Sequence, residues 1–216
     1  MKSRKTHSAR KRGQNRKLVI AGSILLSIAV LLTAAFVWFP SKTPANNAAS
    51  EPEGLKTLAD HYMTVMRNLN STQTKTAITS LLNPDYNQTD LFSWEQTKLT
   101  FANDPNGFFE DPAQILRSGD GICVQWSEVY ASACLALGYQ SRLVAAVDTS
   151  TWSYIHVWAE DYYNGTWVHV DPSDRVWNNP ARYQTWDWGS AIGSTVRVYA
   201  FEDNAYHDVT SSYSAK

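Results

Sequence analysis

The sequence predicts an α+β domain that follows a single transmembrane helix. Three observations support this: an uncharged run of 22 residues near the N-terminus, helical spacing at residues 122–137, and two β-rich runs around an Asn-Gly pair at residues 153–174. The chain of 216 residues is long enough for one domain with its own core plus accessory segments. We expect a basic cytoplasmic tail (1–17), a transmembrane anchor (18–39), a flexible stalk (40–54) and one folded domain (55–216).

The charge of the chain is unevenly distributed. Residues 1–40 contain 8 of the 19 Lys and Arg residues and no Asp or Glu, which leaves 11 basic and 20 acidic residues from residue 41 onward. The predicted domain is therefore acidic. An acidic domain argues against nucleic-acid binding, so we expect no nucleic-acid partner.

The uncharged run at residues 18–39 has the length of a membrane span, because about 20 apolar residues cross the hydrocarbon core of a bilayer. Its basic N-terminal flank predicts that this end stays in the cytoplasm. A cleaved secretory signal is the alternative, since residues 45–49 offer small side chains, but signal apolar regions usually have about 7–15 residues. Both readings place the domain outside the cytoplasm. We predict a single-pass protein of the cell membrane with an extracytoplasmic C-terminal domain.

Two helices are predicted ahead of the cysteines. Apolar residues recur every three or four positions in residues 55–69, and a shorter helix over 74–82 stops before Asn83-Pro84. Residues 101–111 contain acids among turn residues, but their spacing fits no known calcium loop, so a turn is predicted there. No metal or cofactor is expected.

The chain has two cysteines, Cys123 and Cys134. Disulfides are common in proteins outside the cytoplasm, but 11 residues of helix separate these two cysteines by about 16.5 Å. A disulfide needs Cα atoms within about 7 Å, so Cys134 is predicted to be a buried apolar residue. Cys123 lies in the first helical turn, where unpaired N–H groups and a partial positive charge favour a thiolate. The alternative is a small buried residue that happens to begin the helix.

The β-rich runs at residues 153–174 predict a hairpin with Asn164-Gly165 in its turn. A two-residue loop places Tyr163 opposite Thr166, and the resulting register puts His156 and Asp171 on one face as diagonal neighbours, about 7–8 Å apart along the backbone. A three-residue loop would separate them. A carboxylate beside an imidazole fixes its tautomer and stabilises its charged form. If the helix start with Cys123 packs against this face, a Cys-His-Asp nucleophilic site results.

A second histidine, His169, shares this face of the hairpin. It is the alternative base, or a structural histidine paired with Glu160. We favour His156 as the base.

The ordered motifs "GDGIC", "ALGYQSRLV", "HVWAE" and "WVHVDPSD" resemble the transglutaminase-like superfamily of cysteine enzymes. Within it, "CVQWSE", "DPSDRVWNNPARY" and the C-terminal "VRVYAFEDNAYHDVTSSY" resemble the catalytic core of peptide:N-glycanases. The resemblance covers about residues 111–213. It implies a papain-like α+β core in which the cysteine helix packs on an antiparallel sheet, with Cys123, His156 and Asp171 as the catalytic triad.

This chain departs from those glycanases in three ways. It has no paired Cys-x-x-Cys zinc ligands, its domain is predicted to face outward, and Val124 follows the cysteine where a small residue is usual. Aromatic faces stack on sugars, so Trp126 and Trp158 are candidates for substrate binding.

We therefore expect a membrane-anchored cysteine amidohydrolase that cleaves amide bonds of a peptide, glycoprotein or cell-wall peptide through a thioester, with acyl transfer left open. The alternative is a catalytically silent surface domain that binds glycans or peptides.

Overall fold

The computed structural model describes residues 52–108 and 110–215. The predicted tail, the transmembrane anchor and most of the stalk lie outside the described residues. Within the described part of the chain, no helix has the length and apolar character needed to cross a membrane.

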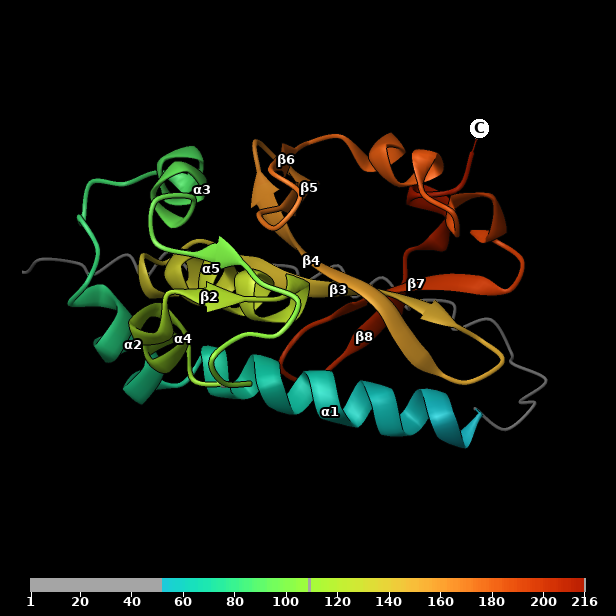
Figure 1. The fold of residues 1–216 in the computed structure, drawn as a ribbon, viewed down its shortest axis with the longest axis horizontal. Helices are drawn as coiled ribbons and strands as arrows, with labels where there is room; N and C mark the ends of the chain where they lie inside the picture. The colour runs from blue at the N-terminus through green and yellow to red at the C-terminus, as the bar shows by residue number, and fades with distance from the viewer. Residues whose placement is uncertain (1–51, 109, 216) are drawn as a thin grey trace, which may run out of the picture. The chain divides into compact units, whose positions relative to one another are not determined.

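Five α-helices and a six-stranded sheet make up most of the described structure (Figure 1). The helices are α1 (Glu53–Leu69), α2 (Thr72–Thr79), α3 (Gln88–Glu95), α4 (Pro112–Ser118) and α5 (Cys123–Ala136). The sheet has the order β6-β5-β4-β3-β7-β8, with all neighbours antiparallel. Its strands are β3 (Ser141–Asp148), β4 (Ser153–Tyr163), β5 (Thr166–Asp171), β6 (Val176–Trp177), β7 (Val196–Phe201) and β8 (Tyr206–Asp208). The predicted α+β class is confirmed.

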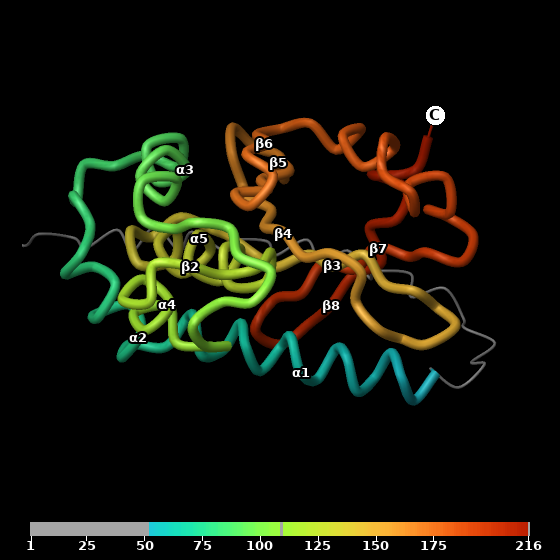
Figure 2. Tube along the Cα trace, viewed as in Figure 1, coloured from blue at the N-terminus to red at the C-terminus, as the bar shows by residue number. Residues whose placement is uncertain are grey.

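Both faces of the central strands are covered. On one face, Leu143 and Ala145 of β3 pack with residues of α1 and α5; on the other, Val144 and Ala146 pack with Tyr183 and other C-terminal residues. The C-terminal segment includes the 3-10 turns η1 (Pro180–Thr185), η2 (Gly189–Ala191) and η3 (Thr210–Ser212). In the trace of Figure 2, the orange turns of this segment lie on the opposite side of the sheet from α1. Burial on both faces explains why β3 reads as a continuous apolar run.

The predicted helices form close to their expected positions. Helix α1 covers the predicted segment and buries an apolar stripe that includes Leu55, Tyr62 and Leu69. Helix α2 begins earlier than predicted because the Ser71 hydroxyl accepts a hydrogen bond from the Thr74 backbone N–H (3.2 Å) and caps the helix.

Helices α3 and α4 were not predicted, although both carry capping signals. Asn87 and Asp90 form a reciprocal capping box at the start of α3. Asp111 caps α4, Pro112 occupies its first turn, and Gly119 ends it in the left-handed conformation (φ 79°). The described residues between Phe101 and Asp111 form an irregular segment with bends, in agreement with the predicted absence of a helix or strand there.

Candidate active site

The first turn of α5, which begins with Cys123 and is called the cysteine turn, follows a pair of short strands. Strand β1 (Thr100–Phe101) pairs in parallel with β2 (Asp120–Gly121), and α5 begins two residues after β2 with Cys123. The Gln125 side chain accepts a hydrogen bond from the Ile122 N–H (3.0 Å) and donates one to the Gly107 carbonyl (2.9 Å). This fixes the first turn of α5, where Cys123 is half-buried.

Helix α5 is also joined directly to the strand that carries His156. The Ser127 hydroxyl lies within hydrogen-bond distance of the Cys123 carbonyl (2.8 Å) and of the Val157 carbonyl on β4 (3.1 Å). One buried side chain therefore connects the cysteine turn to the residue that follows His156. This contact sets how the helix start meets the sheet.

The hairpin forms in the predicted register. Tyr163 pairs with Thr166, and Asn164 and Gly165 both adopt positive φ angles (51° and 87°), as a type I′ turn requires. The predicted contact is confirmed: His156 Nε2 lies 2.6 Å from Asp171 Oδ2. Both side chains are buried.

Asp171 receives four hydrogen bonds, which hold its carboxylate in one orientation. Oδ2 accepts from His156 and from the Tyr183 hydroxyl (2.7 Å). Oδ1 accepts from the Ser173 hydroxyl (2.8 Å) and from the Asp174 N–H (3.0 Å). A carboxylate with every lone-pair direction engaged in this way remains charged and acts as a rigid acceptor for the imidazole.

Interactions among Cys123, His156 and Asp171 favour the charged forms of the histidine and the aspartate. Burial alone would lower the pKa of His156, but hydrogen bonds and charge interactions with Asp171 and Cys123 raise it to about 9. Burial alone would raise the pKa of Asp171, but His156, Tyr183 and Ser173 lower it to about 2. Nε2 of His156 is bonded to Asp171, so Nδ1 is the ring nitrogen left for Cys123. At neutral pH His156 is therefore an imidazolium placed between the carboxylate and the sulfur.

His169 contacts Asp171 only through Tyr183. Its Nε2 is 2.9 Å from the Tyr183 hydroxyl, which itself donates to Asp171. Because that hydroxyl proton points to Asp171, His169 Nε2 carries a proton and donates to the tyrosine oxygen. Burial lowers the pKa of His169 to about 4, so this ring is neutral. The alternative pairing of His169 with Glu160 does not form, since the Glu160 carboxylate is bonded to Arg142 and Tyr213.

The substrate-binding roles predicted for Trp126 and Trp158 require correction, because both indoles are buried, with exposed fractions of 2% and 0%. Trp126 Nε1 donates to the Gly121 carbonyl (3.2 Å), which supports the turn before Cys123. Trp158 stacks behind His156 and donates to the Tyr213 hydroxyl (2.8 Å). Residues two positions along a strand or three along a helix share a face, so these rings extend from the site into the core.

A third tryptophan lies at the site. The ring of Trp186, a partly exposed residue just after η1, has its centroid 4.7 Å from that of His156. The sequence does not indicate this contact, because no local pattern shows that a residue after η1 folds back toward β4. The Trp186 ring is tilted by 53° relative to the imidazole, so it is a partly exposed aromatic neighbour of His156.

Cys134 is buried in the second half of α5. Its sulfur lies 3.4 Å from Asp161 Oδ2, and burial, followed by the charge of Asp161, raises the pKa of its thiol well above the usual value. Both cysteines are free, as predicted. In the part of the chain that the structure describes, no group of three or more His, Cys, Asp or Glu side chains is arranged to hold a metal ion.

Comparisons with known proteins find similar sequences and structures. Residues 71–172, which include all three site residues, match the family model of the transglutaminase-like superfamily. The peptide-N(4)-(N-acetyl-beta-glucosaminyl)asparagine amidase of Oryza sativa subsp. japonica is 31% identical over 104 residues, which are 47% of this chain and 21% of the relative. The amidase of the same name from Yarrowia lipolytica is 28% identical over 110 residues, or 50% of this chain and 28% of the relative.

This chain spans less than a third of the length of these amidases. Among solved structures, Rad4-Rad23 bound to a 6-4 photoproduct UV lesion is similar in fold, with a TM-score of 0.50 and 14% identity over 74% of this chain and 47% of that chain. Residues 71–172, which contain the cysteine at the start of α5 and strands β3 to β5 of the antiparallel sheet, are therefore similar to the transglutaminase-like superfamily, whose family model they match.

Proposed function

We propose that this domain is a cysteine hydrolase of amide bonds, with Cys123 as nucleophile, His156 as acid and base, and Asp171 as the residue that orients His156. The observation that carries the proposal is the imidazole held 2.6 Å from Asp171 while it interacts with a cysteine at a helix start. Similarity to curated amidases supports the choice of an amide bond.

The geometry supports a two-step reaction. The Cys123 thiolate attacks the carbonyl carbon of the amide and forms a C–S bond, while the carbonyl electron pair moves to oxygen. When the tetrahedral intermediate collapses, the C–N bond breaks and His156 Nδ1 gives its proton to the leaving nitrogen. The product of this step is a thioester and a free amine.

Water completes the cycle. His156, now neutral, takes a proton from water, and the oxygen attacks the thioester carbon. The C–S bond breaks, the acid product leaves, and the thiolate–imidazolium pair is restored. The Nε2 proton stays on His156 throughout, and Asp171 accepts its hydrogen bond, which holds the ring in the orientation that both steps need. If an amine takes the place of water, the same intermediate gives acyl transfer.

The proposed substrate is an amide of a peptide, glycoprotein or cell-wall peptide. To test this, the full-length chain is incubated with glycopeptides, peptides and wall fragments, quenched in acid and analysed by mass spectrometry. We expect an acyl adduct on the peptide that contains Cys123 and none on the peptide that contains Cys134. Binding of a substrate without any adduct or turnover would instead favour the silent binding domain.

We also propose that residues 18–39 anchor the domain to the cell membrane, with the N-terminus in the cytoplasm. The basic residues before an uncharged run of 22 support this orientation. External protease should remove the domain from intact cells and leave the short N-terminal tail protected. A protected domain in cells with an accessible outer surface would reverse the orientation, and a released form that begins near residue 50 would indicate a cleaved signal.

A further inference from the structure

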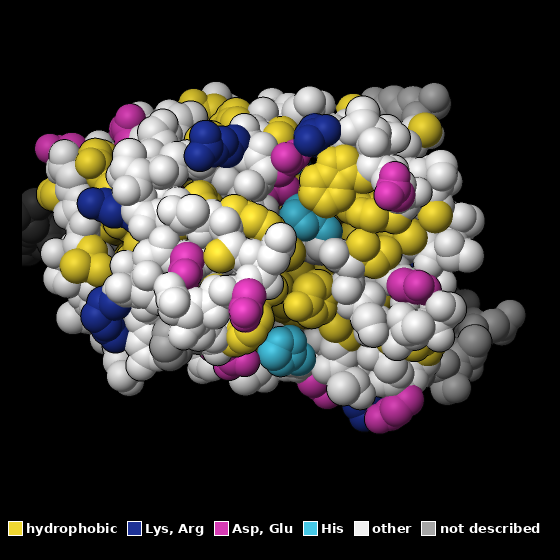
Figure 3. Space-filling model, in the orientation of Figure 1, with side chains coloured by type: hydrophobic (Ala, Val, Ile, Leu, Met, Phe, Trp, Pro, Cys, Tyr) yellow, Lys and Arg dark blue, Asp and Glu magenta, His cyan; other side chains and the backbone are white. Residues whose placement is uncertain are grey.

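A cavity of about 170 Å³ lies beside the cysteine turn. Ile122 and Val124, the two neighbours of Cys123, line it together with Tyr62 of α1, Tyr154 of β4 and Glu128 of α5. Because Cys123 lies between two of these lining residues, the cavity adjoins the first turn of α5 that carries the sulfur. On the face shown in Figure 3, hydrophobic side chains gather between two histidine patches.

The cavity contains a buried acid that the proposed reaction does not use. Glu128 is 2% exposed, and its Oε2 has no hydrogen-bond partner among the described residues. A buried polar atom without a partner costs about 1–3 kcal/mol, and more when it is charged. A ligand that donates a hydrogen bond to this oxygen would remove that cost.

The other walls of the cavity suit a cation. The rings of Tyr62, Tyr154 and Phe108 line it, and Glu110 adds a second carboxyl group that interacts with Glu128. None of the lining residues is Lys or Arg, and His61 is the basic side chain among them. Aromatic faces and carboxylates together are the environment that binds organic cations.

The size of the cavity narrows the ligand further. Pockets for drug-sized molecules measure about 300–1,000 Å³, so this cavity suits one side chain. A guanidinium group is a planar fork that matches two parallel acceptors, whereas an ammonium is a compact charge that a single oxygen can bind. The small volume of the cavity therefore favours the compact ammonium over the larger, planar guanidinium group.

We propose that this cavity is a specificity site that binds an ammonium-bearing side chain of the substrate, with Glu128 as its acceptor and Tyr62 and Tyr154 as its walls. This inference rests on the proposed function, because it assigns the cavity to the substrate whose amide Cys123 attacks. A lysine-like or diamino-acid side chain next to the reacting carbonyl has the required chemistry.

Proton release should accompany binding. Burial, and then the charge of Glu110, raise the pKa of Glu128 well above its usual value, so this carboxyl tends to hold its proton in the free protein. The other titratable groups around it are His61 and Tyr62 of α1 and Tyr154 of β4. An ammonium favours the ionised carboxylate, so preference for the cation should grow as pH rises.

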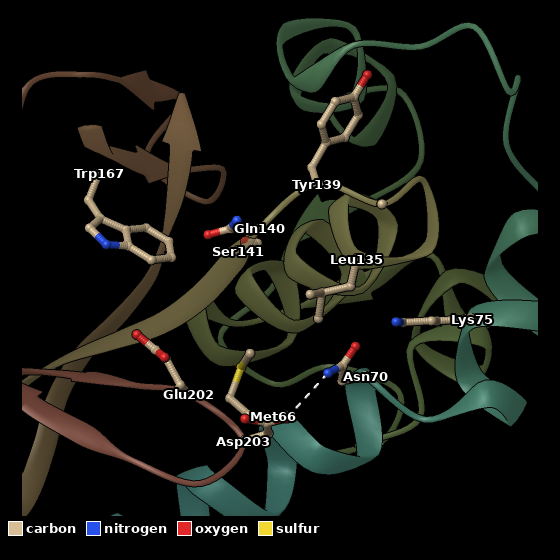
Figure 4. A pocket seen from close by; sticks show the side chains of 11 residues that line it. Met66, Asn70, Lys75, Leu135, Tyr139, Gln140, Ser141, Trp167, Glu202 and Asp203 are labelled. Carbon is tan, nitrogen blue, oxygen red and sulfur yellow. Dashed lines mark hydrogen bonds between the residues drawn. The ribbon is translucent and has the colours of Figure 1, made fainter. Parts of the chain in front are cut away.

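A second cavity, of about 300 Å³, lacks the buried unpartnered oxygen that distinguishes the first among the described residues (Figure 4). It lies near the C-terminal end of α5, where Leu135 is about 18 Å along the helix from Cys123. Its Asn70 already donates to Asp203 (3.4 Å), and no buried unpartnered oxygen lines it among the described residues. It therefore gives no comparable indication of a ligand.

The test measures binding without turnover, on the full-length chain with Cys123→Ala. The probes are Nα-acetyl-lysine amide and its uncharged counterpart, Nα,Nε-diacetyl-lysine amide. The first should bind at least about tenfold more tightly, because a hydrogen bond to a charged group is replaced by one to a neutral amide. Glu128→Gln, which keeps the shape and removes the charge, should reduce this preference to about twofold or less.

Two further variants serve as controls. Glu110→Gln, at an exposed position where folding is not at risk, should reduce the preference by about two- to fivefold. Glu202→Gln, at the other cavity, should leave it unchanged. Equal binding of the two probes by the protein with Glu128 intact, or a preference that Glu128→Gln leaves undiminished, would overturn the proposal. Since no step needs Cys123, the result is independent of whether a thioester forms.

Discussion

Replacing His156 with alanine should lower kcat/KM for amide hydrolysis by a factor of about 10²–10⁴, the usual contribution of a general acid and base. The variant loses both the proton donor for the leaving nitrogen and the base that activates water. It also loses the positive charge that stabilises the Cys123 thiolate, which His156 carries at neutral pH because its pKa is raised to about 9. The measurement is steady-state kinetics on the substrate that gives the acyl adduct.

His169→Ala provides the matched control, because both histidines are buried on the same face of one hairpin. His169 reaches Asp171 only through Tyr183, so its loss should cost less than about tenfold. Tyr183→Phe removes one of four hydrogen bonds to Asp171 and should fall between the two histidine variants. A larger loss for His169→Ala than for His156→Ala would show that His169, and not His156, is the base.

The pairing of His156 with Asp171 was predictable because it depends on local rules. An Asn-Gly turn fixes a two-residue loop, the loop fixes the register, and the two-residue period of a strand fixes the face. The placement of the cysteine at a helix start was equally local, since a Gly-rich turn precedes a helical pattern that ends near Gly138.

The features that escaped prediction depend on contacts between distant segments. Strand β3 carries no alternation because both of its faces are covered, so its apolar run does not distinguish strand from helix. Tyr183 and Trp186 reach the site from a loop that folds back over the sheet. Trp126 and Trp158 have the right neighbours in sequence, but the direction of each side chain leads into the core.

Glu128 could have been noticed from the sequence. It is the single acid in the apolar helix α5, where every residue from Gln125 to Cys134 is buried. A lone carboxyl in such a helix indicates either an internal partner or a cavity. The sequence cannot distinguish these outcomes, because the aromatic walls come from α1 and β4, 66 residues upstream and 26 downstream of Glu128.

The second large effect should be a difference in reactivity between the two cysteines. Iodoacetamide should modify Cys123 of the native full-length chain already at mildly acidic pH, while Cys134 stays unmodified until the protein unfolds. Cys134 is fully buried and its thiol pKa is raised, whereas Cys123 is half-buried beside an imidazolium. Mass spectrometry of the digested protein locates the label, and brief denaturation shows that Cys134 can react.

The pH profile of this labelling tests the ion pair itself. Below a pH of about 9 His156 is charged, so at pH 6 the wild type should label at least about tenfold faster than His156→Ala, which corresponds to about 1.4 kcal/mol of lost stabilisation of the thiolate. As the pH rises through about 9, His156 loses its proton and the two rates should converge. Asp171→Asn should shift the profile in the same direction as His156→Ala, because the imidazolium loses the carboxylate that holds it. If the wild type and His156→Ala label at equal rates at every pH, His156 does not activate Cys123, and the silent binding domain becomes the better account of this site.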